Sequence, residues 1–152
     1  MVDFKSLSSN QRFALNVFVP LLYFFPLAVV YFSSKNFGFG TPEIVPIALV
    51  IGGVGMGIWI LGMVSLGKSL AVLPGTDALK TGGIYRFFRH PIYVGINLTL
   101  FGLLVACGSI FGMVYMAVVV IPLNIYRARI EEKALLEKFG DGYRAYRKKT
   151  LF

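Results

Sequence analysis

The sequence predicts an all-α integral membrane protein with about four membrane-spanning helices in one domain, residues 1–152. Two observations carry this prediction. Hydrophobic residues make up 57% of the chain and charged residues 14%, whereas a soluble domain carries about 25% charged residues. The charges are also missing from three blocks, 13–34, 44–67 and 91–126, and about 20 apolar residues are enough to cross a hydrocarbon core about 30 Å thick.

Each of the first two blocks supplies one span, at about 13–32 and 44–66. The third block contains 36 residues, which would extend about 54 Å as one α-helix, far beyond the thickness of the bilayer core. We therefore expect a turn near residue 108 that divides this block into spans at 91–106 and 109–126. These last two spans form a tight hairpin.

The basic residues predict which connections share one side of the membrane. Fourteen of the 15 Lys and Arg residues fall before the first span, in the connector 67–90 or in the tail 127–152, and Lys35 alone falls in another loop. Because Lys and Arg collect on the cytoplasmic side of membrane proteins, we expect both termini, the connector and the tail to be cytoplasmic. In a prokaryotic cell the membrane would be the inner, cytoplasmic one.

The composition excludes several kinds of site. Cys107 is the only cysteine and His90 the only histidine, so we expect no internal disulfide and no metal site. The net charge of +8 is better explained by contact with an anionic cytoplasmic leaflet than by nucleic-acid binding. Close packing of the second span against another helix is favoured by its glycines, which include a small-xxx-small step from Gly53 to Gly57: Gly52, Gly53, Gly55, Gly57 and Gly62.

The most distinctive segment lies where the chain enters the third span. Arg86, Arg89 and His90 precede Pro91, and proline suits the first position of a helix. One interpretation is a basic anchor at the level of the lipid headgroups, with tyrosine and phenylalanine beside it. The alternative is a binding site.

A second polar cluster follows the fourth span. Asn124, Arg127 and Glu131 lie within about 60° of one another on a helix and form one polar stripe. If the hairpin turn is centred near residue 108, three pairs face each other within about one helical turn: Tyr93 with Asn124, His90 with Arg127, and Arg86 with Glu131. Asn97 continues the polar line into the hydrocarbon zone, where a polar side chain is costly and indicates a buried partner. A membrane anchor alone requires neither acids nor an asparagine here.

The tail is predicted to form an amphipathic helix that ends at Gly140, followed by a basic, aromatic helix at about 143–149. Two placements of this second helix are open. It can lie on anionic headgroups, or it can fold back as a lid over the polar clusters.

Three motifs follow one another in the second half of the chain: Arg89-His90-Pro91-x-Tyr93-x-Gly95, Glu131-Glu132-x-x-Leu135, and Phe139-Gly140-x-x-Tyr143-x-x-Tyr146. Their order and spacing resemble the isoprenylcysteine carboxyl methyltransferase and phospholipid methyltransferase superfamily of integral membrane enzymes. The segments 66–69 and 79–86 are similar to those that precede the first motif in prokaryotic members. The resemblance covers about residues 66–149.

The resemblance implies a methyltransferase that uses S-adenosylmethionine as methyl donor and acts on a lipophilic, membrane-resident acceptor. The acceptor would be an isoprenylcysteine-type carboxylate or a lipid headgroup amine. The resemblance implies His90, Pro91, Tyr93, Gly95, Glu131 and Glu132 for donor binding, and Arg86, Arg89 or His90 can hold the methionine carboxylate of the donor. The predicted catalytic residues are Asn124, Arg127 and Glu131. Arg127 matches a family position near the acceptor, where it can orient an anionic acceptor or pair with Glu131.

Two other functions remain open at this point. Membrane sterol reductases carry a similar Arg-His-Pro-x-Tyr-x-Gly segment and use NADPH, although they require many more spans than four to enclose a sterol. A non-catalytic membrane scaffold or lipid-binding protein could also retain this fold. The sequence predicts no oligomeric state.

Overall fold

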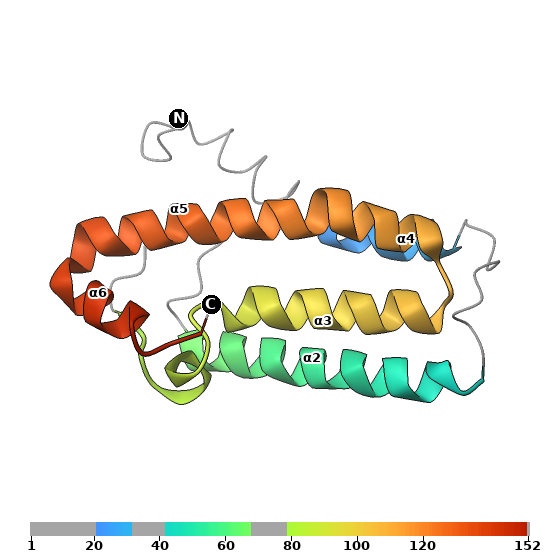
Figure 1. Ribbon diagram of the computed structural model, residues 1–152, viewed down its shortest axis with the longest axis horizontal. Helices are drawn as coiled ribbons and strands as arrows, with labels where there is room; N and C mark the ends of the chain where they lie inside the picture. Colours follow the sequence, from blue (N-terminus) through green and yellow to red (C-terminus); the bar gives the residue numbers. More distant parts are fainter. Residues whose placement is uncertain (1–20, 32–41, 68–78, 152) are drawn as a thin grey trace.

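The computed structural model describes residues 21–31, 42–67 and 79–151 (Figure 1). Only the second part of the predicted span 13–32 is therefore described, as the helix Leu21–Tyr31. The N-terminal segment and most of the connector's first half, 68–78, lie outside the described residues, as does the expected loop around Lys35.

The described residues are helical, with one isolated backbone bridge between Phe88 and Leu151. After the helix Leu21–Tyr31 the elements follow in this order: α2 (Ile44–Leu66), η2 (Gly83–Arg86), α3 (Pro91–Ala106), α4 (Ile110–Tyr115), η3 (Met116–Val120), α5 (Ile121–Phe139) and α6 (Asp141–Arg147). This architecture confirms the all-α prediction.

The hairpin between α3 and α4 forms where the uncharged block was expected to turn. Pro91 begins α3, and the helix ends at Ala106. Gly108 then adopts a positive φ of 62°, which only glycine adopts without steric cost. The Ser109 hydroxyl accepts a hydrogen bond of 3.1 Å from the Gly112 amide and caps α4. The glycine and the cap together allow the chain to reverse direction within the few residues between α3 and α4.

The second arm of the hairpin is one long helical rod from Ile110 to Phe139, in which α4, η3 and α5 follow without a break (Figure 1). It has the length and hydropathy to cross a membrane, as does α2. Helix α3, with 16 residues, and the described helix Leu21–Tyr31 are apolar but shorter. The structure thus supports two spanning helices by length and composition, and the count of four stays a prediction.

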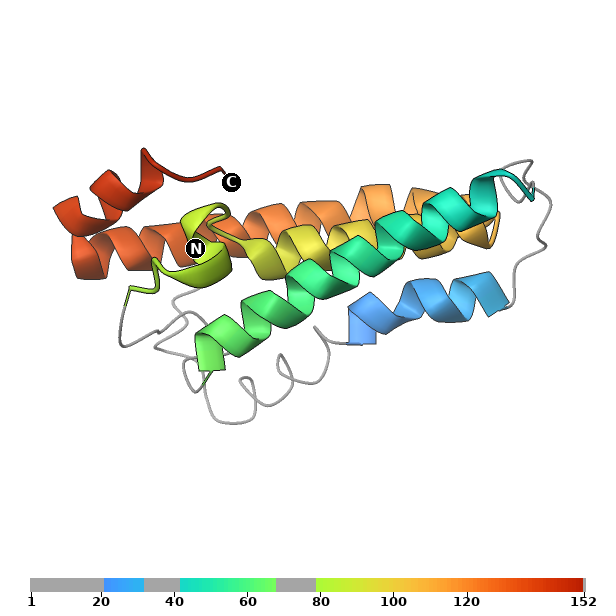
Figure 2. The same cartoon turned by 90° about the horizontal axis from the view of Figure 1, so that it is seen from below.

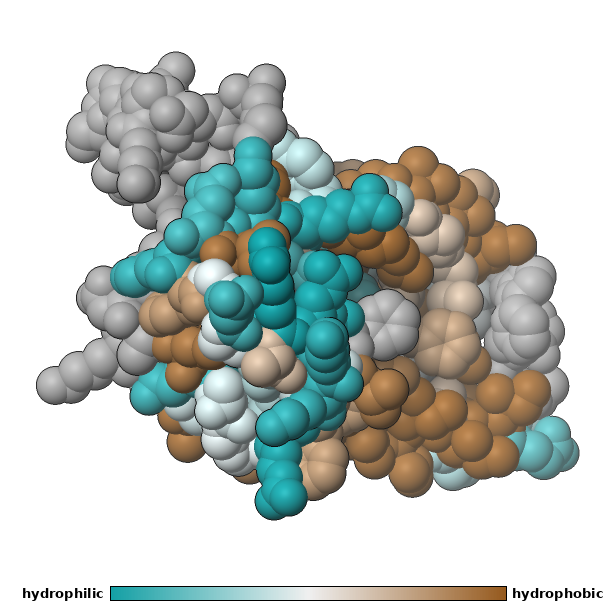
Figure 3. Space-filling model, turned by 60° about the vertical axis from the view of Figure 1, so that its left-hand side comes forward, coloured by the Kyte–Doolittle hydropathy of each residue, from teal (hydrophilic) through white to brown (hydrophobic). Residues whose placement is uncertain are grey.

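Apolar side chains cover the outside of the helices. Large hydrophobic residues such as Val64 and Val118 are 72% and 68% exposed, and they lie on the two long helices. Figure 3 shows hydrophobic residues along the flank of the molecule and hydrophilic ones gathered at the near end, where α5 and α6 meet. Exposed apolar surface of this extent marks contact with lipid or with another protein.

Helices α2 and α3 pack through glycine (Figures 1 and 2). A Cβ atom placed on Gly55 would lie 2.5 Å from the Thr99 nitrogen, and one on Gly95 would lie 2.5 Å from the Trp59 nitrogen. Side chains cannot occupy such positions, so glycine on both helices allows the two backbones to approach.

Three of the five glycines expected to allow close packing are at the contact, but the Gly53–Gly57 step is not. A Cβ on Gly53 or Gly57 would meet nothing within 4 Å. The residues that face α3 are Gly52, Gly55 and Gly62, which are buried. The contact glycines are spaced by three and seven residues, which places them on one face of α2. The two glycines of the four-residue step lie on another face.

The first helix packs on the other side of the hairpin. Tyr115 donates a hydrogen bond of 3.3 Å to the Leu22 carbonyl, and its ring lies 4.9 Å from that of Phe25. Beneath it, Leu100 and Leu104 of α3 meet Met116 and Val120 of η3 in the buried core cluster. The hairpin is therefore held between α2 and the helix Leu21–Tyr31.

The tail folds back on the connector. Gly140 ends α5 with a φ of 51°, as expected for its role as a helix terminator, and α6 starts at once. Tyr146 is buried and donates a hydrogen bond of 2.7 Å to the Tyr85 carbonyl. Beyond α6, the Leu151 amide donates to the Phe87 carbonyl at 2.9 Å and the Arg89 amide donates to the Leu151 carbonyl at 3.1 Å. The structure has the fold-back onto the connector, which is compatible with the other placement of this helix, on anionic headgroups.

Candidate active site

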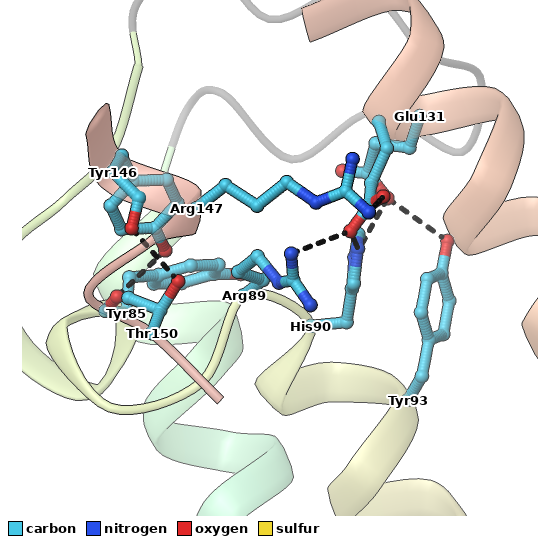
Figure 4. Close-up of polar contacts among 9 residues, drawn as sticks. Tyr85, Arg89, His90, Tyr93, Glu131, Tyr146, Arg147 and Thr150 are labelled. Carbon is cyan, nitrogen blue, oxygen red and sulfur yellow. Dashed lines mark hydrogen bonds and ion pairs between the residues drawn. The ribbon is translucent and has the colours of Figure 1, made fainter. Parts of the chain in front are cut away.

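His90 lies at the centre of the polar cluster, between two carboxylates. It precedes Pro91 and so projects from the very start of α3, and it is 9% exposed. Its Nδ1 lies 3.6 Å from a Glu131 carboxylate oxygen, and its Nε2 lies 3.5 Å from a Glu132 oxygen (Figure 4). Both acids come from α5, so the histidine joins the two arms of the hairpin at one end.

A chain of hydrogen bonds extends from this centre along the facing helices. Arg127 donates from Nε to the Tyr93 hydroxyl at 3.3 Å, and that hydroxyl donates to Glu131 at 3.3 Å. The Tyr93 ring also stacks on His90, with centroids 5.7 Å apart. The arginine, the phenol and the carboxylate thus form a continuous polar path beside the histidine.

A second polar group lies deeper between the helices. The Asn124 amide nitrogen donates to the Asn97 side-chain oxygen at 2.8 Å, and the Tyr23 hydroxyl donates to the Asn124 oxygen. Asn124 is only 3% exposed. This arrangement supplies the buried partner that Asn97 and Asn124 require at this depth.

Arginines from the connector and the tail complete the cluster around the acids. Arg89 approaches Glu132 at 3.4 Å and Arg147 of α6 approaches it at 3.9 Å. Arg89 is largely buried, whereas the Arg147 side chain is 58% exposed, so solvent weakens the second pair. Figure 4 shows both guanidinium groups extending toward the carboxylates beside His90.

The tyrosines where the tail meets the connector are in a dry environment. Burial, with the carboxylate of Glu131 nearby, raises the pKa of the Tyr85 phenol. Burial and the Glu132 carboxylate raise the pKa of Tyr143. Burial also raises the pKa of Tyr146 to about 12, against the opposing influence of Arg89. All three phenols therefore lie in a water-poor region at the end of the site where the tail meets the connector.

The facing pairs are displaced by about one turn from those expected. Asn124 meets Asn97, not Tyr93, and His90 meets the acid pair, not Arg127. Side chains on a helix tilt toward its N-terminus, so those of antiparallel helices meet partners farther along the chain. The π-helical turn of η3 adds one residue in the same direction.

The structure separates some of the residues that the sequence grouped. Among the described contacts, Arg86 makes none with Glu131, and it lines a different hollow together with residues of α6. Pro91 is fully buried at the start of α3 and sets the direction of His90. Gly95 faces Trp59 of α2, so its direct contact is with the neighbouring helix.

Two neighbours of the site were not foreseen. Tyr23 comes from the first helix, and Arg147 comes from the tail. The sequence held one signal for Tyr23. An asparagine buried at membrane depth needs a hydrogen-bond donor from another helix. Arg147 lies in a run of basic residues, and nothing in that run distinguishes it from its neighbours.

The cluster offers the groups that S-adenosylmethionine requires. Within the described residues, the buried Arg89 Nε and His90 Nε2 have no hydrogen-bond partner, and an arginine can bind a carboxylate. The paired glutamates can accept from an ammonium group or from ribose hydroxyls. The described residues contain no group of three or more His, Cys, Asp or Glu side chains that could hold a metal ion.

Fold and site together define a class of protein. It is a helical protein with two rods long and apolar enough to cross a membrane among the described residues, and with acids, arginines and a histidine gathered at one end. The chain belongs to the phospholipid methyltransferase family, whose model matches residues 43–142. This match confirms the superfamily that the motifs resemble.

Individual relatives point in the same direction. Protein-S-isoprenylcysteine O-methyltransferase of Schizosaccharomyces pombe is 33% identical over 93 residues, which cover 58% of this chain and 39% of that protein. The human and mouse proteins of the same name are 38% identical over 78 residues, or 49% of this chain and 26% of each relative. The similarity thus covers less than half the length of these relatives. No solved structure matches the chain.

Proposed function

We propose that this protein transfers a methyl group from S-adenosylmethionine to the carboxylate of a lipophilic acceptor at the cytoplasmic boundary of a membrane. One observation carries the proposal. The first family motif, at the start of α3, and the acidic pair of α5 converge on His90, where Glu131 and Glu132 lie 3.6 and 3.5 Å from its two ring nitrogens. Residues far apart in the chain thereby form one site for a charged ligand.

In this proposal the donor is held by the connector, α5 and the tail. When bound, S-adenosylmethionine supplies a methyl group on a sulfonium, which is ready for in-line displacement. Arg89 and His90 bind the carboxylate of its methionine part, and Glu131 and Glu132 bind its amino group or ribose hydroxyls. Arg86 is left out of this set because it lines a different hollow.

The remaining polar residues receive the acceptor. Arg127 lies on the hydrocarbon side of the acid pair and is held by Tyr93, so its cation favours an anionic acceptor over an ammonium group. Asn124 lies one turn before Arg127 on α5 and holds this part of the helix against α3 through its hydrogen bond to Asn97. A carboxylate is already ionised at neutral pH and needs no general base, whereas an amine would first have to lose a proton.

Catalysis then depends on position. A displacement at a methyl carbon needs little covalent help from the protein, so holding the two reactants in near-attack geometry supplies most of the acceleration. The proposed multi-pass arrangement with a cytoplasmic connector and tail serves this need. The water-soluble donor enters from the cytosol and the lipophilic acceptor from the bilayer.

Transfer of a labelled methyl group from S-adenosylmethionine tests the proposal. Purified protein is incubated with a prenylcysteine analogue, with the same analogue blocked as its methyl ester, and with an extract of membrane lipids. We expect label in the free carboxylate only. Label in the lipid amines would overturn the carboxylate assignment, and its absence from every acceptor would count against methyl transfer.

Calorimetric titration separates the donor from its alternatives. S-adenosylmethionine and S-adenosylhomocysteine should both bind, and NADPH should not. Binding of NADPH alone would support a reductase instead.

A further inference from the structure

A hollow of about 300 Å³ lies between η2 and α6. The connector contributes Thr81 and Arg86 to its wall, and the tail contributes Ala145, Lys149 and Thr150, with Tyr146 and Gly142 completing it. None of the residues assigned to the donor lines this hollow. It is therefore a separate feature at the same end of the molecule.

Among the described residues, the wall of the hollow carries positive charge and no acid. It contains Arg86 and Lys149 but no Asp or Glu, and within the described residues neither cation forms an ion pair. Thr81 lies in the same wall, and its hydroxyl is a further donor. Guanidinium, ammonium and hydroxyl groups around one hollow match the oxygens of a phosphate.

The wall is also held in place. Tyr146 binds the Tyr85 carbonyl at 2.7 Å, and Thr150 donates from its hydroxyl to the Tyr146 carbonyl at 3.1 Å (Figure 4). The backbone bridge between Phe88 and Leu151 joins connector and tail a second time. A preformed site loses less conformational entropy when a ligand binds.

Apolar side chains flank the cations. Phe87 follows Arg86 directly and is 63% exposed, and Leu151 follows Thr150 and is 69% exposed. Both lie close to the start of α3, where the uncharged block begins, because backbone hydrogen bonds join Leu151 to Phe87 and Arg89. An aromatic and an aliphatic side chain at such a boundary suit contact with acyl chains below the headgroups.

We propose that the hollow binds the phosphate of an anionic glycerophospholipid, with Arg86 and Lys149 on the phosphate and with Phe87 and Leu151 against the upper acyl chain. The flanking apolar residues favour a lipid over a soluble phosphate compound. The site anchors connector and tail to the bilayer surface. This inference does not rest on methyl transfer, because it concerns residues outside the proposed donor and acceptor sites.

Native mass spectrometry of the full chain in detergent tests the proposal. The probes are phosphatidylglycerol, phosphatidylcholine with the same acyl chains, and inorganic phosphate. The pocket variant is Arg86→Gln with Lys149→Gln. A matched control, Arg129→Gln with Lys148→Gln, removes the same charge from exposed residues that do not line the hollow.

We expect wild type to retain phosphatidylglycerol over phosphatidylcholine, the pocket variant to lose about tenfold of this retention, and the control to stay within about threefold of wild type. Equal losses in the two variants would overturn the proposal, since they would indicate general surface charge. Phe87→Ser with Leu151→Ser provides the second measurement. Unchanged lipid retention in it, together with comparable retention of inorganic phosphate, would assign the hollow to soluble phosphate and overturn the lipid site.

Discussion

Helix α3 makes two very different contacts along its length. Toward α2 it presents Gly95 and Gly102, and the interface is backbone against backbone. Toward α5 it presents His90, Tyr93 and Asn97, and the interface is a series of polar contacts. The comparison shows that the contact with α2 fixes α3 in place, while the contact with α5 holds the polar side chains of the candidate site together.

The glycine contact predicts the largest effect on stability. Gly95→Ala would bring a methyl group to 2.5 Å from a backbone nitrogen of α2, and a backbone cannot move aside as a flexible side chain can. We expect a loss of about 3 kcal/mol in the free energy of unfolding. Thermal unfolding in detergent measures it.

Gly57→Ala is the control for this variant, because it adds the same methyl group to α2 where nothing lies within 4 Å. We expect it to be neutral or slightly stabilising, since alanine favours a helix. A melting temperature lowered equally in both variants would refute the assignment of the packing face.

The polar contact predicts a loss of donor binding with the helices intact. Glu131→Ala removes a carboxylate that faces both His90 and Tyr93, and we expect affinity for S-adenosylmethionine to fall by about thirtyfold, or about 2 kcal/mol. Glu137→Ala removes an acid of the same helix that is 69% exposed and should leave affinity unchanged. Calorimetry distinguishes them, and equal affinities would remove Glu131 from the proposed donor site.

A smaller effect is expected where the first helix joins the polar contact. Tyr23→Phe leaves the buried Asn124 oxygen without the hydroxyl that donates to it, which should cost about 1 kcal/mol in the free energy of unfolding. Tyr31→Phe changes the same residue type at a position 83% exposed on the same helix. Both are compared by thermal unfolding, and a wild-type melting temperature for Tyr23→Phe would show that Asn124 gains nothing from the first helix.

The smallest effect concerns the pH dependence of the docked tail. Because the pKa of Tyr146 is raised to about 12, above its usual value of about 10, the folded protein keeps the proton longer than the unfolded chain. Its contribution to stability is complete below about pH 10 and is lost as the pH rises toward 12. The difference in tyrosinate absorbance between wild type and Tyr146→Phe should titrate near pH 12, and a midpoint near pH 10 would contradict a buried phenol.

The elements of the fold were more predictable than the contacts between them. The charge-free block, Pro91 and Gly108 were enough to place the hairpin, because helix boundaries depend on local residues. The packing glycines of α2 were identified as a group, but which of them face α3 was not, since α2 is apolar all round and its hydropathy does not distinguish one face from another. Side-chain direction and the π-helical turn displaced the facing pairs by a turn.

Most members of the polar cluster that forms the candidate site were predictable, but their geometry was not. His90, Tyr93, Arg127 and the acid pair were identified from motif and helical spacing, and the structure brings them together. Arg86 was grouped with them because it is close in sequence, yet the 3-10 turn that contains it points it elsewhere. Contacts from distant segments, such as Tyr23, depend on tertiary packing that no local pattern encodes.

The π-helical turn at Met116–Val120 lies well away from the polar cluster, yet it decides how α5 would respond to a change in chain length. Each residue of an α-helix turns the chain by about 100°, and a π-helical turn takes up about one residue more for the same rotation. Deletion of a single residue here would therefore restore a regular helix and leave Arg127, Glu131 and Glu132 facing α3. Deletion of a single residue between Ile121 and Arg127, where the helix is regular, would instead rotate all three side chains away from α3 by about 100°. The polar cluster thus tolerates the loss of a residue on one side of Ile121 and not on the other.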